Sequence, residues 1–380
     1  MNGMKILFTG GGTGGHFYPI IAIAEAIHEI ETKERLLPAD LYFSSDSPYD
    51  AQQLFNHNIS YVEIKTGKRR TYASFLNVLD IFKTAFAIIQ AIGRVFVIYP
   101  DVVFGKGGYA SYPTLWAARI LGIPVLIHES DTVPGRVNVW ASKFAKYVVV
   151  SYPDAAKYFP ADKVVVTGNP LRKEAMLPIT QGSFKFLELE EGVPVLLVIG
   201  GSQGAQIINE VILDSLPLLL DKYQIVHQVG EKNEAEIKSR LPIILEKLPK
   251  KSRYKMYPYL NDLTLRMSAG VADLVISRAG SAIFEIAAWK KASIIIPITE
   301  SMGDHQKKNA FHYARAHAAV VIEEANLTPH VLAEEIDRIV GDPTLKKSME
   351  EAASKFSEHS VDAADKIARQ LLKISLGHEV

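Results

Sequence analysis

Three glycine-rich turns carry most of the chemical information in this 380-residue sequence, and they suit the binding of phosphate groups. They are the segments 9–16 (TGGGTGGH), 105–109 (GKGGY) and 200–204 (GGSQG). Glycine lets the backbone approach a phosphate closely, and a following helix offers free N–H groups and a positive dipole end. The first and third turns follow apolar runs at 5–8 and 195–199, and both precede amphipathic helical patterns. This arrangement is typical of two nucleotide-binding folds that handle two phosphorylated substrates.

Ionisable side chains stand close to these turns in the first half of the chain. His16 ends the first turn, and the segment His128-Glu129-Ser130-Asp131 closes another apolar strand pattern. Ligands bind at the carboxyl ends of the strands in open α/β sheets. His16 is therefore a candidate for a general base or a phosphate ligand, and the 128–131 segment is expected at the ligand-binding edge of the sheet. The alternative for His16 is a helix-capping or packing residue, and the alternative for Glu129 and Asp131 is helix capping and local hydrogen bonding.

The second half repeats the pattern of strand, turn and helix at 277–281 (SRAGS), with Glu285 in the helix that follows. A carboxylate near a nucleotide can accept hydrogen bonds from both ribose hydroxyls. The apolar neighbours Ile283 and Phe284 argue against the alternative, a solvated helix face. The segment 304–309 (DHQKKN) begins another helix, and its amide and imidazole groups could donate hydrogen bonds to the hydroxyls of a sugar. The alternative is an ordinary polar helix start.

A nicotinamide-dependent oxidoreductase is one rival interpretation of the first turn. Gly10, Gly12 and Gly15 match the dinucleotide fingerprint, and Asp46 is a candidate for the acid that such an enzyme needs at the end of its second strand. The similar turn in the second half argues against this class, because one such turn is enough for a dehydrogenase. The sequence has no cysteine and no clustered metal-ligand spacing, so we expect no disulfide, thiolate nucleophile, metal site or other bound cofactor.

The composition indicates a soluble protein with two hydrophobic cores. The chain is longer than a domain with one ordinary hydrophobic core, and 48% of its residues are hydrophobic. The formal net charge is +0, which gives no indication of a nucleic-acid partner. The N-terminus lacks a signal-peptide pattern, and the apolar stretch 75–99 contains Asp80, Lys83 and Arg94. We therefore expect a cytoplasmic protein without a membrane span, although it could touch a membrane.

Strand patterns alternate with helical patterns along the chain, which predicts two doubly wound α/β domains. The expected domains are residues 1–168, with 357–380 crossing back to them, and residues 169–356. The expected strands of the first domain are 5–8, 41–44, 61–64, 102–104, 125–128, 147–151 and 164–167. Those of the second are 195–199, 225–229, 254–257, 274–277, 293–297 and 319–322.

The final segment, 360–374, has apolar residues at helical spacing. It comes after the second domain is complete, so we expect its helix to return to the first domain. Packing on the second domain is the alternative.

The segment 74–93 predicts a helix with more apolar surface than one core contact needs. Its first stripe contains Phe75, Leu79, Phe82, Phe86 and Ile89, and its second contains Val78, Ile81, Ala85, Ile88 and Ile92. The basic residues Lys65, Lys68, Arg69 and Arg70 precede it. Basic residues beside surplus apolar surface favour contact with anionic lipid, whereas a deeply buried helix is the alternative.

In this order, these motifs resemble the MurG family, which makes lipid II for the bacterial cell wall. The resemblance covers nearly the whole chain. It is carried by segments 11–16 with Pro19, 105–109, 128–129, 168–170 with Arg172, 200–204, 277–280 with Glu285, and 304–306 with Asn309. It implies a metal-independent inverting glycosyltransferase with two Rossmann-like domains facing a cleft, the GT-B fold. It also implies a peripheral protein on the cytoplasmic face of the plasma membrane, acting in peptidoglycan synthesis.

The resemblance assigns roles to particular residues. UDP-N-acetylglucosamine, the donor, would lie on the second domain, with Ser202 at a phosphate, Glu285 at the ribose, and His305 and Gln306 at the sugar. The donor set also includes Thr13, Gly14, Gly15, Asp131, Arg172, Gly201, Gln203, Gly204, Arg278 and Gly280. Lipid I, an undecaprenyl-diphosphate-linked muramyl peptide, would meet Gly12, Thr13, Gly14, Gly15, His16, Lys106, Gly107, Gly108 and Tyr109. Lys68, Arg69, Arg70, Phe75, Leu79, Phe82 and Phe86 would form a patch facing an anionic membrane.

The implied reaction is attack of the muramyl 4-hydroxyl on the anomeric carbon, opposite to UDP. His16 is the first candidate for the base, with Glu129 or Asp131 second. Many relatives have Asn where this chain has Asp131, and Glu285 lies one residue closer to Arg278 than in many members. A UDP-N-acetylglucosamine 2-epimerase, which shares the architecture, is a second rival function.

Overall fold

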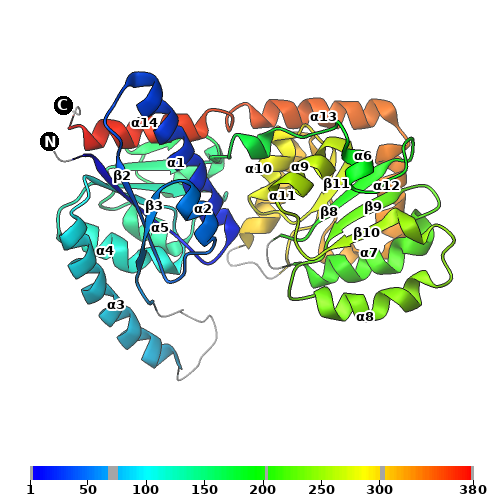
Figure 1. Ribbon diagram of the computed structural model, residues 1–380, viewed down its shortest axis with the longest axis horizontal. Helices are drawn as coiled ribbons and strands as arrows, with labels where there is room; N and C mark the ends of the chain where they lie inside the picture. Colours follow the sequence, from blue (N-terminus) through cyan, green and yellow to red (C-terminus); the bar gives the residue numbers. More distant parts are fainter. Residues whose placement is uncertain (1–2, 67–75, 202–203, 300–303, 378–380) are drawn as a thin grey trace. The chain divides into compact units, whose positions relative to one another are not determined.

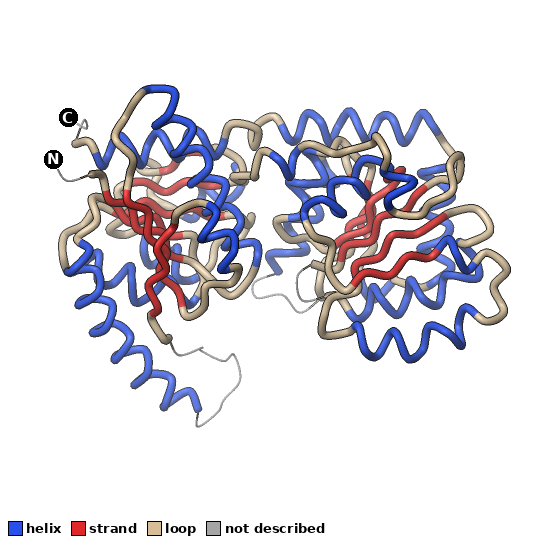
Figure 2. Tube along the Cα trace, viewed as in Figure 1, coloured by secondary structure: helices blue, strands red, loops and turns tan. Residues whose placement is uncertain are grey.

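The computed structural model describes residues 3–66, 76–201, 204–299 and 304–377, and it leaves the side chains of 76–82 undescribed. The chain forms two compact units. Unit 1 contains Met1–Arg172 and His359–Val380, and unit 2 contains Lys173–Glu358. Each unit is a parallel sheet flanked by helices (Figures 1 and 2). This confirms the predicted class, two doubly wound α/β folds.

The sheet of unit 1 has the strand order β3-β2-β1-β4-β5-β6-β7, and all its pairs are parallel. The order reverses between β1 and β4, which is where ligands bind in this class of sheet. The strands are β1 (Lys5–Thr9), β2 (Asp40–Ser45), β3 (Ile59–Glu63), β4 (Val102–Gly105), β5 (Val125–Glu129), β6 (Tyr147–Val150) and β7 (Val164–Val166).

Helices cover both faces of this sheet, because its strands are apolar on both sides. In β1, Ile6 and Phe8 belong to one core, whereas Leu7 belongs to the core on the opposite face. The helices of unit 1 are α1 (Gly14–Glu34), α2 (Ala51–Asn56), α3 (Leu76–Ile98), α4 (Tyr112–Ile120), α5 (Arg136–Ala141) and α14 (Ala363–Ser375).

The C-terminal helix α14 belongs to unit 1, which confirms the predicted return of the chain. Helix α14 lies beside α1 (Figure 1). Ile367 and Leu371 are buried in the same core as Ile20 and Ile27 of α1. The returning chain passes close to Gly168, where an added side-chain carbon would lie 2.5 Å from the carbonyl oxygen of His359. Gly168 also has φ +82°, a conformation that favours glycine.

Unit 2 repeats the architecture with the strand order β10-β9-β8-β11-β12-β13, which reverses between β8 and β11. Its strands are β8 (Val195–Ile199), β9 (Gln224–Gln228), β10 (Tyr254–Tyr257), β11 (Ala272–Ser277), β12 (Ser293–Ile295) and β13 (Ala319–Val321). Its helices are α6 (Ser183–Phe186), α7 (Gln206–Leu219), α8 (Glu234–Leu245), α9 (Asp262–Val271), α10 (Ala282–Ala288), α11 (His305–Arg315), α12 (Pro329–Val340) and α13 (Pro343–Ser357).

Every strand predicted from the sequence is present, with ends that differ by up to two residues. The predicted helix near 74–93 is α3, which continues to Ile98. Among the described residues, no helix combines the length and apolar character that a membrane span requires.

Candidate functional site

The first two glycine turns meet at the carboxyl ends of the neighbouring strands β1 and β4. Their backbones approach so closely that a methyl group added at Gly108 would lie 3.1 Å from the carbonyl oxygen of Gly11. Gly107 and Gly108 have φ values of +89° and +80°, which favour glycine. The close backbone contact favours glycine at Gly108, whereas an added carbon at Gly11 or Gly107 would meet the side chain of Ser45 or Asn138.

His16 lies between the two turns, in the first turn of α1. Its Nδ1 is 2.9 Å from Oγ1 of Thr13, and its side chain is half-buried. Its Cε1 and Nε2 atoms would each lie 3.8 Å from a methyl group added at Gly108. The Nε2 edge of the imidazole therefore lies next to the second turn.

Tyr109 and Asp46 link the second turn to the end of β2. The hydroxyl of Tyr109 donates to Oδ2 of Asp46 at 2.5 Å. Burial and this bond raise the pKa of Tyr109. Asp46, the candidate acid of the nicotinamide interpretation, therefore accepts a hydrogen bond from a side chain of the same unit.

Glu129 at the end of β5 is buried and accepts three hydrogen bonds. They come from the backbone N–H groups of Asp131 and Gly135, both at 3.0 Å, and from Nδ2 of Asn138 at 2.9 Å. Burial, and next the charge of Asp131, raise the pKa of Glu129. These bonds hold the 130–135 segment in place, which is the alternative role, local hydrogen bonding, that the sequence analysis left open for Glu129. The bonding partner Asn138 gave no local sequence signal.

Lys106, a residue of the second turn, is a buried basic side chain. Its Nζ has no hydrogen-bond partner among the described residues. Burial lowers the pKa of Lys106 to about 8, although the carboxylates of Glu129 and Asp131 oppose that shift. Neighbouring His128 is also buried, and burial and the charge of Lys106 hold its pKa well below the usual value. His128 is therefore neutral, with Nε2 3.2 Å from Oγ of Ser151.

The third glycine turn follows β8 in unit 2 and leads into α7. Its ends are joined by a bond from the N–H of Gly204 to the carbonyl oxygen of Gly201 at 3.1 Å. Ser202, the predicted phosphate contact, and Gln203, another predicted donor residue, lie outside the described residues. Because β8 and β11 are neighbours, the 277–281 turn follows the adjacent strand at the same edge of the sheet.

Arg278 in that turn forms an ion pair with Glu324 at 2.7 Å and donates to the carbonyl oxygen of Ile296 at 3.1 Å. The other oxygen of Glu324 accepts bonds from the backbone N–H and the hydroxyl of Thr299. Burial alone raises the pKa of Glu324, but the bonds from Thr299 and Arg278 lower it overall. Glu324 thus joins the ends of three elements, and the sequence analysis did not identify it.

Four other predicted donor residues, Gly280, Glu285, His305 and Gln306, lie in unit 2 at the starts of α10 and α11, whereas Thr13, Gly14, Gly15 and Asp131 lie in unit 1. Glu285 is half-buried in the first turn of α10, and Gly280 has open space beside it. His305 and Gln306 begin α11, where Oε1 of Gln306 accepts the N–H of Ile298 at 3.2 Å. Asn309 donates to the carbonyl oxygen of Ala279 at 3.1 Å, which connects the two helix starts.

Arg172 belongs to unit 1, although the resemblance assigned it to the donor site. It is 9% exposed, and its guanidinium carbon lies 4.3 Å from the ring centroid of Tyr18, within range of a cation–π interaction.

The described part of α3 has one buried face and one apolar exposed face. Ala87, Ala91 and Val95 are buried, whereas Phe86 and Ile89 are 68% and 67% exposed. The exposed face also includes Phe96 and Val97. Lys68, Arg69, Arg70 and Phe75 lie outside the described residues, as do the side chains of Leu79 and Phe82.

Within the described segments, no group of three or more histidine and acidic residues is placed to hold a metal ion.

Family models place both units in one family. The N-terminal domain of glycosyltransferase family 28 matches residues 6–150, and its C-terminal domain matches residues 195–367. A UDP-N-acetylglucosamine–N-acetylmuramyl-(pentapeptide) pyrophosphoryl-undecaprenol N-acetylglucosamine transferase of Bacillus cereus is 35% identical over 338 residues. That alignment covers 88% of this chain and 91% of the relative.

Solved structures agree with this result. MurG of Acinetobacter baumannii superposes with a TM-score of 0.69 and 27% identity, over 97% of this chain and 99% of that protein. The UDP-N-acetylglucosamine 2-epimerase of Neisseria meningitidis superposes with a TM-score of 0.67 but only 15% identity, over 97% and 100% of the two chains. The likeness to the epimerase therefore shows a shared fold alone.

Proposed function

This chain belongs to glycosyltransferase family 28, in its MurG branch, and we propose that it makes lipid II. It transfers N-acetylglucosamine from UDP-N-acetylglucosamine to the muramyl 4-hydroxyl of lipid I, with inversion at the anomeric carbon. The observation that carries this proposal is the 35% identity to a named transferase across 88% of the chain. The glycine turns at both sheet reversals support it, because each is suited to bind phosphate groups.

The donor is held by unit 2. The turn between Gly201 and Gly204 precedes α7, so free N–H groups and the helix dipole can stabilise the charge that develops on the leaving UDP. Glu285 accepts hydrogen bonds from the ribose hydroxyls, and His305 and Gln306 contact the N-acetylglucosamine group. This stabilisation needs no metal ion.

The acceptor is held by unit 1, where its diphosphate meets the turns at 10–15 and 105–108. Lys106 supplies a cation beneath these turns that has no hydrogen-bond partner among the described residues. A buried ammonium group strengthens the attraction for a phosphate because little water screens it.

His16 acts as the general base for the muramyl hydroxyl. For Nε2 to accept that proton, Nδ1 must carry a hydrogen, which Oγ1 of Thr13 accepts at 2.9 Å. Asp131 is the second candidate, because Glu129 already accepts three hydrogen bonds.

The enzyme is peripheral on the cytoplasmic face of the plasma membrane, where the polyprenyl tail of lipid I resides. Withdrawing that tail from the bilayer costs about 0.8 kcal/mol for each exposed methylene group. The exposed apolar face of α3, together with Lys68, Arg69 and Arg70, provides the membrane contact.

The direct test supplies labelled UDP-N-acetylglucosamine and a lipid I analogue to the purified protein. We expect a β-1,4-linked disaccharide on the acceptor. Formation of UDP-N-acetylmannosamine without acceptor would instead establish the epimerase function.

A further inference from the structure

A buried ion pair joins two segments that follow non-neighbouring strands of the unit 2 sheet. Arg278 directly follows β11, and Glu324 follows β13, whereas β12 lies between these two strands. Nη1 of Arg278 is 2.7 Å from Oε1 of Glu324, and the two side chains are only 12% and 11% exposed. The ion pair therefore bridges the carboxyl end of β12.

The same two side chains bond both ends of the segment that follows β12. Nη1 of Arg278 also donates to the carbonyl oxygen of Ile296 at 3.1 Å. Oε2 of Glu324 accepts the N–H of Thr299 at 2.8 Å and its hydroxyl at 2.6 Å. The segment 296–299 is thus bonded at its first and last residues by one charged pair.

Two further bonds connect this ion pair to α11. Oε1 of Gln306 accepts the N–H of Ile298 at 3.2 Å, and Ile298 lies inside the segment that the pair bonds. Nδ2 of Asn309 donates to the carbonyl oxygen of Ala279 at 3.1 Å, and Ala279 directly follows the arginine of the pair. The same turn leads into α10, which carries Glu285 in its first turn. The pair is therefore connected to both helices that carry the predicted ribose and sugar contacts.

The chemistry of the pair suits a role in orientation. A buried ion pair is often no more stabilising than apolar residues of the same volume, because both charges lose their hydration. Apolar side chains, however, could not bond the carbonyl oxygen of Ile296 or the N–H of Thr299. What the charged pair adds is a fixed geometry for the backbone at the ends of neighbouring strands.

We propose that Glu324 is a positioning residue that acts through Arg278 and Thr299 and fixes the start of α11 relative to the start of α10. One UDP-sugar then meets Glu285 and Gln306 together. This inference rests on the proposed function of unit 2, and it gives Glu324 no contact with the substrate. Its effect is therefore largest for ligands that reach both helices. UDP-N-acetylglucosamine does so through its ribose and its sugar, whereas UDP has the ribose alone.

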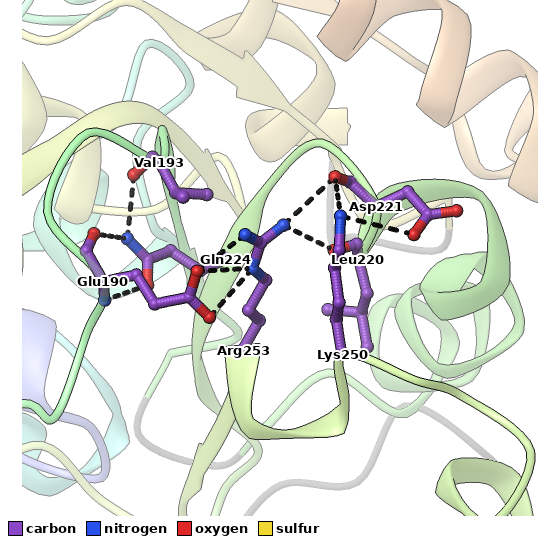
Figure 3. Close-up of polar contacts among 7 residues, drawn as sticks. All are labelled: Glu190, Val193, Leu220, Asp221, Gln224, Lys250 and Arg253. Carbon is purple, nitrogen blue, oxygen red and sulfur yellow. Dashed lines mark hydrogen bonds and ion pairs between the residues drawn. The ribbon is translucent and has the colours of Figure 1, made fainter.

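Unit 2 offers a matched control at the opposite edge of its sheet, the ion pair of Glu190 and Arg253 (Figure 3). Nη2 of Arg253 is 2.6 Å from Oε2 of Glu190, and Nη1 donates to the carbonyl oxygens of Leu220 and Asp221 at 3.1 and 3.0 Å. Arg253 directly precedes β10, so this pair lies at the amino ends of the strands. Glu190→Gln therefore breaks an ion pair of the same chemistry without touching the starts of α10 and α11.

The experiment measures binding of UDP and of UDP-N-acetylglucosamine to the wild type, Glu324→Gln and Glu190→Gln. Glutamine keeps the size of the side chain and removes its charge. We expect Glu324→Gln to weaken binding of UDP-N-acetylglucosamine about tenfold, the loss of about one hydrogen bond to the sugar, and binding of UDP less than about twofold. With a lipid I analogue, the KM for the donor should rise while the KM for the acceptor stays constant. Glu190→Gln should keep the wild-type ratio of the two affinities.

An equal loss of both affinities in Glu324→Gln, no loss of either, or the same selective loss in Glu190→Gln overturns the proposal. If Glu324→Gln does not fold, the ratio is measured with Thr299→Val, which removes one bond to Glu324 and keeps the ion pair. A smaller loss that is selective for UDP-N-acetylglucosamine is then expected, and an unchanged ratio overturns the proposal. Failure of both variants to fold would make the network purely structural, which also overturns it. A wild-type protein that binds neither ligand contradicts the proposed function instead.

Discussion

The exposed face of α3 gives the sharpest test of the membrane proposal. The change is the double substitution Phe86→Ser and Ile89→Ser. Both side chains are about two-thirds exposed, at 68% and 67%, so the folded protein gains little from their contacts. We expect nearly unchanged folding stability and much weaker binding to lipid vesicles.

The magnitude follows from the apolar surface that a membrane could still cover. Full burial of a Phe or Ile side chain contributes about 1.5–3 kcal/mol. Two-thirds of that is about 1–2 kcal/mol for each residue, or about 2–4 kcal/mol for the pair. Vesicle affinity should therefore fall by a factor of about 30 to 1000.

The assay is co-sedimentation with vesicles that contain anionic lipid, at low and high salt, followed by activity measurements. Activity on lipid I embedded in vesicles should fall, whereas activity on a short-chain soluble acceptor should be retained. The controls are Phe55→Ser on α2 and Ile243→Ser on α8, at positions that are 79% and 75% exposed. A loss of activity on both acceptors, or a similar loss of vesicle binding in the controls, would refute the membrane role of α3.

Four further outcomes follow from the proposed site. Glu285→Ala should raise the KM for the donor by about 10- to 150-fold, because it removes charge-assisted hydrogen bonds that contribute about 1.5–3 kcal/mol. A KM for the donor within twofold of the wild-type value would exclude the ribose contact. His16→Ala should lower kcat by a factor of about 10²–10⁴, while the affinity for UDP measured by titration stays constant. If kcat falls only a few-fold, His16 is not the general base, and Asp131→Asn becomes the next variant to measure. Activity should persist in excess EDTA, and a loss that magnesium or manganese restores would contradict charge stabilisation by the glycine turn. Gly168→Ala should lower the free energy of unfolding by at least about 1–2 kcal/mol, measured by urea denaturation, because its φ is +82° and the added carbon meets the His359 carbonyl.

Local patterns were sufficient for the fold. Strands buried on both faces are continuous apolar runs, and the glycines stand where parallel strands end and helices begin. The apolar spacing from Ile367 to Ile374 predicted α14 in the same way. The partner of α14 was inferred from chain order, and the packing against α1 confirmed it.

The candidate site could be predicted only as far as its residues lie inside such motifs. His16 and Glu285 were predicted as site residues because they flank glycine-rich turns. The sequence did not show that Glu129 holds the 130–135 segment, since carboxylates that accept backbone bonds and carboxylates that accept protons look identical in a sequence.

By itself, the sequence determined the two α/β units, the glycine-rich turns and the family, because these depend on short-range patterns. Only the tertiary structure decided which polar groups hold the turns in place. Glu324 reaches Arg278 and Gln228 reaches Gly201 from neighbouring elements of the folded chain. Their partners lie 46 and 27 residues away in the sequence, and no local pattern specifies a bond across such a separation. The parallel sheet makes those bonds possible, because it brings the carboxyl ends of separate strands to one edge.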